Sequence, residues 1–142
     1  MRKYNHMITR FVIYGLLGWN MEILWTGLSS VTDGSFNLIG HTSVWMFFVY
    51  GSAVFALEPI HPKISHLNWF YRGCIWTVLI FLIEFISGML LKLIGIEAWH
   101  YSCPLSVCGV IRLDYAPLWF VVGLLFEKAH SMLLLLNKTQ KG

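Results

Sequence analysis

Charged residues are scarce in this 142-residue chain. Only 12% of its residues are Asp, Glu, Lys or Arg, and 57% are hydrophobic, whereas ordinary soluble domains have about 25% charged residues. The mean hydropathy is +0.65. This composition excludes most water-soluble folds and also intrinsic disorder, which requires low hydrophobicity. A net charge of +3 is too small for a nucleic-acid surface, so we expect membrane lipid as the surroundings and no nucleic-acid partner.

Four segments are predicted to cross the membrane. A spanning helix needs about 20 mostly apolar residues, and the candidates lie at about residues 11–28, 38–58, 73–94 and 116–136. The second is the least apolar, and Pro59 and Pro62 are predicted to end it. The loops are too short for a soluble domain. The expected fold class is therefore an all-α integral membrane protein, a four-transmembrane-helix bundle forming one domain over residues 1–142.

Basic residues are distributed unevenly around these spans. Eight fall on one predicted side of the membrane: Arg2, Lys3, Arg10, Lys63, Arg72, Lys128, Lys138 and Lys141. The other side has two basic residues and three acids: Lys92, Arg112, Asp33, Glu97 and Asp114. Because Lys and Arg concentrate on the cytoplasmic side, both termini are predicted to be cytoplasmic. Lys128 is counted there because a long side chain can extend along its own helix. We expect a multi-pass protein of the plasma or inner membrane.

Three glutamates lie inside the predicted spans. Each is eleven residues from the start of its span, or about 17 Å into a core about 30 Å thick: Glu22, Glu84 and Glu127. Each also has a glycine four residues away on the same helix face: Gly18, Gly88 and Gly123. Small residues mark faces where membrane helices approach closely. We therefore expect the three carboxylates to point inward and to converge.

A charge at the centre of a membrane helix costs about 2.5–3.5 kcal/mol, and no buried Arg or Lys is predicted beside these acids. Three interpretations remain open: a site for a cation, a proton or a small polar ligand, protonated glutamates that hold helices in register, or catalysis. The candidate ligand- or ion-binding residues are Glu22, Glu84, Glu127, Asn20, Tyr50 and Tyr115. Asn20 has the alternative of bonding a neighbouring helix or a partner chain. No catalytic residue, metal or cofactor is assigned.

The loop before the last span contains a His-x2-Cys-x4-Cys pattern, formed by His100, Cys103 and Cys108. In an oxidising exterior a local disulfide between the two cysteines is the preferred interpretation. Free thiols and a metal site are the alternatives, although zinc usually needs a fourth ligand or a water. Four other histidines are scattered along the chain and are interpreted as polar loop or helix-end residues: His41, His61, His66 and His130.

Several short motifs occur in an order that resembles a known family. They include Gly18-Trp19-x-x-Glu22, Tyr50-Gly51, Glu84-Phe85-x-x-Gly88, Trp99-x-Tyr101-Ser102 and Leu113-Asp114-Tyr115-Ala116. Over about positions 10–130 the chain resembles the CmpB-like ABC-transporter type IV membrane family and the related transmembrane protein 229 group. The resemblance implies a multi-pass helical protein with Glu22, Glu84 and Glu127 in motif positions, but no established activity. His100 and Asp114 replace the family's usual Asp and Glu.

These observations leave three functional hypotheses. The first is a transport-related membrane protein with a polar, cation-binding or proton-binding site made by the intramembrane glutamates. The second is a structural or assembly subunit of a larger membrane complex, as a homo-oligomer or with another membrane subunit. The third and least favoured is an intramembrane enzyme acting on a lipid or isoprenoid, because the sequence contains no clear nucleophile or metal site.

Overall fold

The computed structural model describes residues 2–32 and 34–139, with side chains described for residues 6–32 and 34–136. Five residues used for the predicted orientation lie outside the described side chains: Arg2, Lys3, Asp33, Lys138 and Lys141. The chain divides into two compact units, Met1–Ser52 and Ala53–Gly142. Each unit is described by itself, and the cytoplasmic location of the termini stays a prediction.

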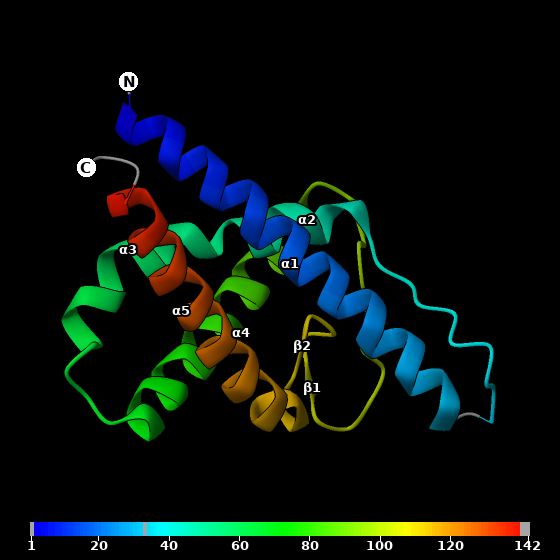
Figure 1. Ribbon diagram of the computed structural model, residues 1–142. Coiled ribbons are helices and arrows are strands. Elements are labelled where there is room, and N and C mark those ends of the chain that lie inside the picture. Colours follow the sequence, from blue (N-terminus) through cyan, green and yellow to red (C-terminus); the bar gives the residue numbers. More distant parts are fainter. Residues whose placement is uncertain (1, 33, 140–142) are drawn as a thin grey trace. The chain divides into compact units, whose positions relative to one another are not determined.

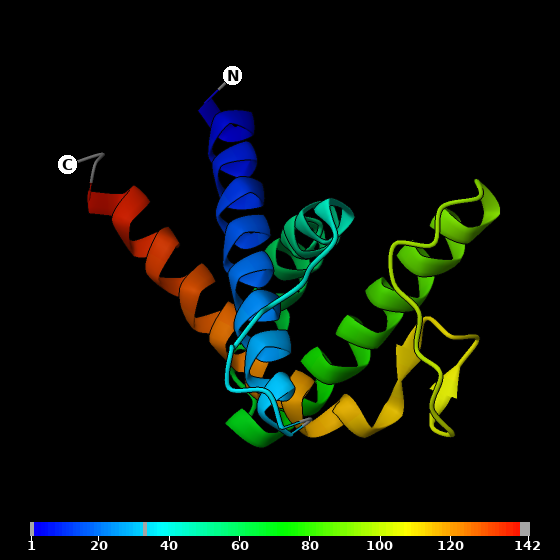
Figure 2. The ribbon, with the colours of Figure 1, turned by 90° about the vertical axis from the view of Figure 1, so that its right-hand side faces the viewer.

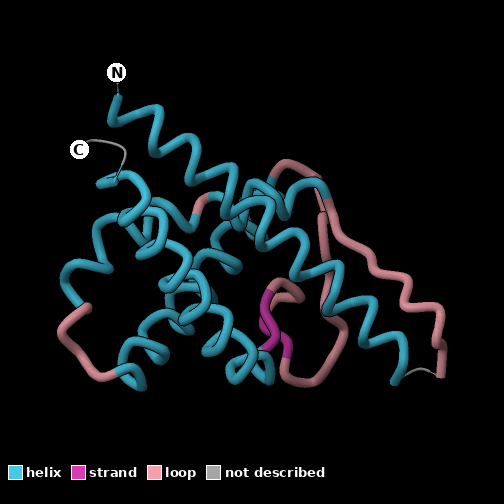
Figure 3. The backbone as a smooth tube through the Cα atoms, in the orientation of Figure 1, coloured by secondary structure: helices cyan, strands magenta, loops and turns pink. Residues whose placement is uncertain are grey.

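The described residues form mainly helices (Figure 1). In chain order the elements are α1 (Arg2–Thr32), α2 (Val44–Gly51), α3 (Ala53–Ile64), α4 (Trp69–Leu93), β1 (Ser106–Val107), β2 (Ile111–Arg112), the 3-10 helix η1 (Leu113–Tyr115) and α5 (Ala116–Thr139). Figure 3 marks the two short strands in magenta between α4 and α5. The expected all-helical class is therefore confirmed, with a small hairpin added.

Three segments of the described chain are long and apolar enough to cross a membrane: Val44–Ile64, Trp69–Leu93 and Leu113–Leu136. They overlap the second, third and fourth predicted spans, with the second displaced by about six residues. The first predicted span lies within α1, a helix of 31 residues that is not among the three. The structure therefore supports a helical membrane protein with three candidate spans, and the count of four stays a prediction.

Two predicted helix boundaries are wrong. Pro59 and Pro62 lie inside α3 and do not end it. Each proline removes one backbone donor, but the surrounding helical bonds continue, as the Ser65 amide donates to the His61 carbonyl at 2.9 Å. A membrane helix tolerates proline in this way when nearby groups replace the lost bonds. In addition, α4 begins at Trp69, where Asn68 accepts a hydrogen bond from the Phe70 amide at 3.2 Å.

In the unit Met1–Ser52, glycines of α1 lie directly against aromatic side chains of α2. A Cβ on Gly15 would come within 2.7 Å of the Phe47 ring, and one on Gly18 would overlap the Tyr50 ring. The two glycines therefore allow α2 to approach α1 closely, as small residues do in membrane proteins. This confirms the expected close-packing role of the face that carries Gly18.

The connection between α1 and α2 is bonded back to α1 at two points. The Thr26 hydroxyl accepts from the His41 amide at 2.8 Å. About two turns earlier on α1, the Trp19 indole N–H donates to the Ser43 carbonyl at 3.1 Å. These bonds fix the residues that precede α2 along the middle of α1, which includes Glu22.

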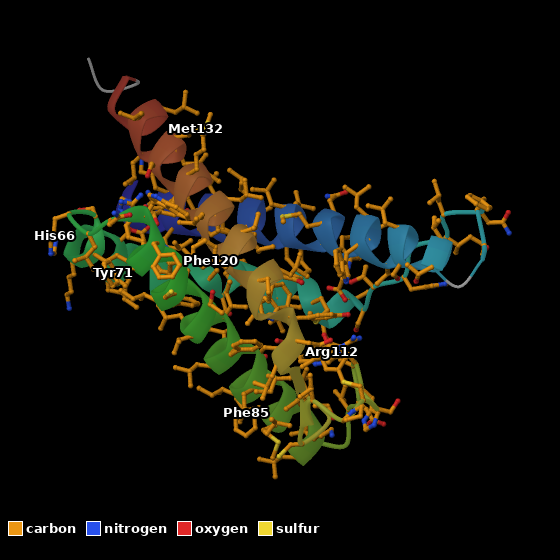
Figure 4. The ribbon with its side chains drawn as sticks, turned by 90° about the horizontal axis from the view of Figure 1, so that it is seen from below. His66, Tyr71, Phe85, Arg112, Phe120 and Met132 are labelled. Carbon is orange, nitrogen blue, oxygen red and sulfur yellow. The ribbon has the colours of Figure 1, made fainter. Side chains whose placement is uncertain are left out.

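In the unit Ala53–Gly142, α4 and α5 pack against each other. Gly73 of α4 makes room for the Phe120 ring, and Gly123 of α5 makes room for Trp76. Figure 4 shows Phe120 beside the part of α4 that carries Tyr71. The first half of α4 therefore packs on the first half of α5 through reciprocal contacts of glycine with an aromatic side chain.

The segment after α4 folds back along that helix (Figure 2). Its hairpin pairs Val107 with Ile111 in antiparallel register. The Trp99 indole donates to the Val110 carbonyl at 2.9 Å, and Val110 is buried against Gly88 of α4. Gly88 therefore provides the surface on which this segment packs.

We expect Gly88→Ala to destabilise the protein by up to about 2 kcal/mol. The new Cβ would lie 2.8 Å from Val110 and 3.1 Å from Trp99. Such overpacking typically costs about 1–3 kcal/mol, and a gain of about 1 kcal/mol in helix propensity offsets part of this cost. The measurement is the free energy of unfolding in mixed micelles. Ser87→Ala is the control, because the Ser87 hydroxyl bonds the backbone of its own helix. Equal stability of the two variants would contradict the packing role.

Candidate functional site

Glu22 of α1 is bonded by two hydroxyl groups from the segment that follows. The Thr42 and Tyr50 side chains both hydrogen-bond its carboxyl group, and the second carboxyl oxygen, Oε2, is buried without a hydrogen-bond partner among the described residues. The structure thus brings together two of the six candidates, Glu22 and Tyr50. Thr42 was missed, because nothing in its sequence context shows that the loop returns along α1.

Asn20 is not part of this group. Its side-chain amide donates to the Leu16 carbonyl of the same helix at 2.7 Å, at an exposed position. The side chain therefore forms a local bond on α1, and the structure does not join it to Glu22 or to Tyr50.

Glu84 of α4 is only 3% exposed. Its Oε1 accepts a hydrogen bond from the Tyr101 hydroxyl at 3.1 Å. Tyr101 belongs to the segment between α4 and β1, where its amide donates to the Gly109 carbonyl at 2.9 Å. The hydrogen-bond donor to this carboxylate is therefore a residue of the loop that packs on Gly88 of α4.

Tyr115 packs against Tyr101, the donor to Glu84. Its ring packs edge to face with Tyr101, with centroids 5.8 Å apart. Arg112 covers the ring, with its guanidinium carbon 4.5 Å from the centroid, and also donates to Asp114 at 2.8 Å. Hydrogen bonding to Asp114 raises the pKa of Arg112 above its ordinary value. Tyr115 thus packs against the residue that donates to Glu84.

Glu127 of α5 is 7% exposed and is held from α4 by two different groups. The Trp76 indole N–H donates to Oε2 at 2.5 Å, and the Arg72 guanidinium forms an ion pair with Oε1 at 2.8 Å. His61 of α3 lies 3.8 Å from the same Oε1. Three helices therefore meet at this carboxylate.

The ion pair corrects the expectation that no arginine or lysine accompanies the intramembrane acids. Arg72 was assigned to a loop because the third span was predicted to begin at Gly73. Since α4 begins at Trp69, Arg72 lies in its first turn and its side chain reaches Glu127. A buried carboxylate that is paired in this way avoids most of the cost of an isolated charge.

Glu84 and Glu127 do not form one site. On α4, the contacts of Glu127 are Arg72 and Trp76, and Glu84 lies eight residues after Trp76, or about 12 Å along the helix. Figure 4 shows Arg112 toward the end of α4 that carries Phe85, away from Tyr71. The expected convergence of these two carboxylates is therefore not found. Glu22 belongs to the other unit.

The predicted disulfide in the loop is wrong, because Cys103 and Cys108 are free thiols. Cys108 occupies the turn between β1 and β2 with a positive φ of 54°. His100 is paired with Glu97, at 2.9 Å between Nδ1 and Oε1. Within the part of the chain that the structure describes, no group of three or more His, Cys, Asp or Glu side chains is arranged to hold a metal ion.

The fold and the buried carboxylates define a helical membrane protein with polar sites inside its apolar helices. The chain belongs to the family described as "Putative ABC-transporter type IV", which matches residues 9–140. The suspected family is therefore confirmed, and with it the transport-related membrane character at the level of the family. No solved structure matches this chain.

We expect Trp76→Phe to lower the free energy of unfolding by about 2–3 kcal/mol, since a hydrogen bond to a charged group contributes about 1.5–3 kcal/mol. Phe keeps an aromatic ring beside Gly123 but lacks the indole N–H that donates to Glu127. Trp69→Phe, at an exposed position of the same helix, is the control and should change stability by less than about 0.5 kcal/mol.

The contribution of the hydrogen bond between Trp76 and Glu127 is isolated by making Trp76→Phe and Trp69→Phe also in a protein that carries Glu127→Gln. The effect of Trp76→Phe should shrink in the Gln background, because the charged acceptor is gone. An effect that is the same in both backgrounds would contradict the assignment.

Proposed function

We propose that this chain is a transport-related membrane protein whose intramembrane glutamates bind a proton, a small cation or a small polar ligand. The family description supports transport. One structural observation carries the proposal: at each glutamate, a donor group from another segment reaches the carboxyl group where a nearby glycine allows close packing. Gly18 accommodates Tyr50, Gly123 accommodates Trp76, and Gly88 accommodates the loop that carries Tyr101.

The donors at Glu22 and Glu84 favour an exchangeable ligand. The donors are the hydroxyl groups of Tyr50, Thr42 and Tyr101. A hydroxyl group stabilises a carboxylate without adding an opposite charge. A hydroxyl group can also accept a hydrogen bond or coordinate a cation. These groups can therefore remain bonded whether the carboxyl group is ionised, protonated or in contact with a cation, as a site in a transport path requires.

The proposal includes the topology predicted from the sequence, with four spans, cytoplasmic termini and location in the plasma or inner membrane. The length of α1 supports its role as a further span, since 31 residues extend over about 46 Å. This exceeds the hydrocarbon core of about 30 Å. In this topology Tyr115 acts on the Glu84 site by positioning Tyr101, and Asn20 has no assigned role.

A second candidate function is a structural or assembly subunit of a larger membrane complex. The observation that favours it is the ion pair between Arg72 and Glu127, because a paired buried charge fixes the register of two helices. The candidate predicts that a second membrane protein or a second copy of this chain co-purifies, and that Glu127→Gln disrupts this association.

The transport proposal is tested with purified protein in lipid vesicles, following uptake of protons with an internal pH dye and uptake of sodium ions. We expect Glu84→Gln to reduce uptake at least tenfold, because it removes the charge of the proposed site, and Tyr101→Phe to reduce it several-fold. Glu97→Gln is the control, since Glu97 is exposed in the loop and should leave uptake unchanged. Vesicles with wild-type protein that take up neither ion faster than empty vesicles would overturn the proposal.

A further inference from the structure

His61 occupies a more specific environment than a polar helix end. It lies in α3, and its side chain is 16% exposed. Its Nε2 is 3.3 Å from the Ser131 hydroxyl oxygen and 3.8 Å from Glu127 Oε1. Its ring also packs perpendicular to that of His130, with centroids 5.1 Å apart. One ring nitrogen thus faces both a hydroxyl group and a carboxylate of α5.

The hydrogen bonds of Ser131 indicate which nitrogen of His61 is protonated. The Ser131 hydroxyl donates to the Glu127 backbone carbonyl at 3.0 Å, which uses its single proton. Toward His61 the hydroxyl oxygen can then only accept. Because the bond to the carbonyl is the shorter of the two, the contact of 3.3 Å favours the neutral ring with its proton on Nε2 and with Nδ1 as the basic nitrogen.

The charged groups around His61 come from three helices. On α5, Glu127 faces its Nε2, and His130 packs on the ring. On α4, Arg72 is bound to the same Oε1 of Glu127 at 2.8 Å. On α3 itself, Glu58 lies three residues earlier and Lys63 two residues later. Arg72 and His61 therefore lie beside the same carboxylate oxygen of Glu127.

We propose that His61 is a proton-binding site whose protonation changes the partners of Glu127. A proton binds at Nδ1 and gives an imidazolium ion, and the Nε2–H bond then moves from Ser131 to Glu127 Oε1. The present distance of 3.8 Å is too long for a hydrogen bond, so this exchange requires a shift of about 1 Å. Two cations then share one carboxylate, which weakens its pair with Arg72.

The proton can also pass on to the carboxylate. When Nε2 releases its proton to Oε1, His61 becomes neutral with its proton on Nδ1, and Glu127 becomes neutral and no longer pairs with the Arg72 cation. No other bond is made or broken. The inference rests on the proposed function and deepens it, because it names the proton as the ligand of the Glu127 site and His61 as the residue that delivers it.

Exposure distinguishes His61 from the neighbouring histidines. His130 is 1% exposed, whereas the side chain of His61 is 16% exposed. His66, in the connection between α3 and α4, is exposed and provides a matched control on the same side of α4.

The test is nitrogen-15 NMR of histidine-labelled full-length protein in lipid, with His61→Gln used to assign the signal. At pH 8 we expect His61 to carry its proton on Nε2, and Ser131→Ala to remove most of this preference. At pH 5 the doubly protonated ring should show a hydrogen bond to a carboxylate that is lost in Glu127→Gln. His66→Gln should change neither result, and unchanged signals of the other histidines show that each variant is folded.

A His61 proton on Nδ1 at pH 8, or identical low-pH signals in wild type and Glu127→Gln, would overturn the inference. Proton uptake by vesicles separates it from the proposed function. We expect His61→Gln to reduce proton uptake at least fivefold relative to His66→Gln. If the NMR results are as expected but the wild type transports neither protons nor sodium ions, His61 is a proton-binding site and the transport proposal is wrong.

Discussion

A carboxyl group inside an apolar helix must be hydrogen-bonded, and the donor has to come from a different segment of the chain. In this protein an aromatic side chain donates to each of the three glutamates: Tyr50 to Glu22, Tyr101 to Glu84 and Trp76 to Glu127. At Glu22 and Glu127 this side chain packs directly on the glycine of the same helix face. It reaches the carboxyl group because the helix surface four residues away has no side chain. Gly18 and Gly123 make room for these rings, so the spacing of glycine and glutamate on one helix determines where the next segment packs.

The three glutamates share this construction, but the groups that bond them differ in charge. Glu22 and Glu84 are bonded by hydroxyl groups, whereas Glu127 is paired with the guanidinium group of Arg72. A hydroxyl donor is compatible with gain or loss of a proton or cation, while an ion pair favours a fixed charge until another cation competes for it. His61 is placed to be that competitor. The first two acids are therefore suited to binding a ligand, and the third to responding to protonation.

The sequence predicted the features that follow from local periodicity. These are the apolar helices, the three acids within them and the glycine on the same face as each acid. It did not predict the partners, because Trp76, Tyr101 and Arg72 reach their carboxylates through the packing of α4 on α5 and of a loop on α4. The periodicity of one segment carries no information about how two segments pack. For the same reason the sequence did not predict that Glu84 and Glu127 have different partners, Tyr101 for the first and Trp76 with Arg72 for the second.

The most direct test is infrared spectroscopy of the Glu127 carboxylate, with its band assigned by Glu127→Gln. A methyl group on Gly123 would displace Trp76, the donor to Glu127, whereas one on Gly73 would meet Phe120, which is not a donor. We predict that Gly123→Ala shifts the band of the unaltered glutamate and that Gly73→Ala does not. An unchanged band in Gly123→Ala, or an equal shift in both variants, would contradict the claim that the glycine positions the donor.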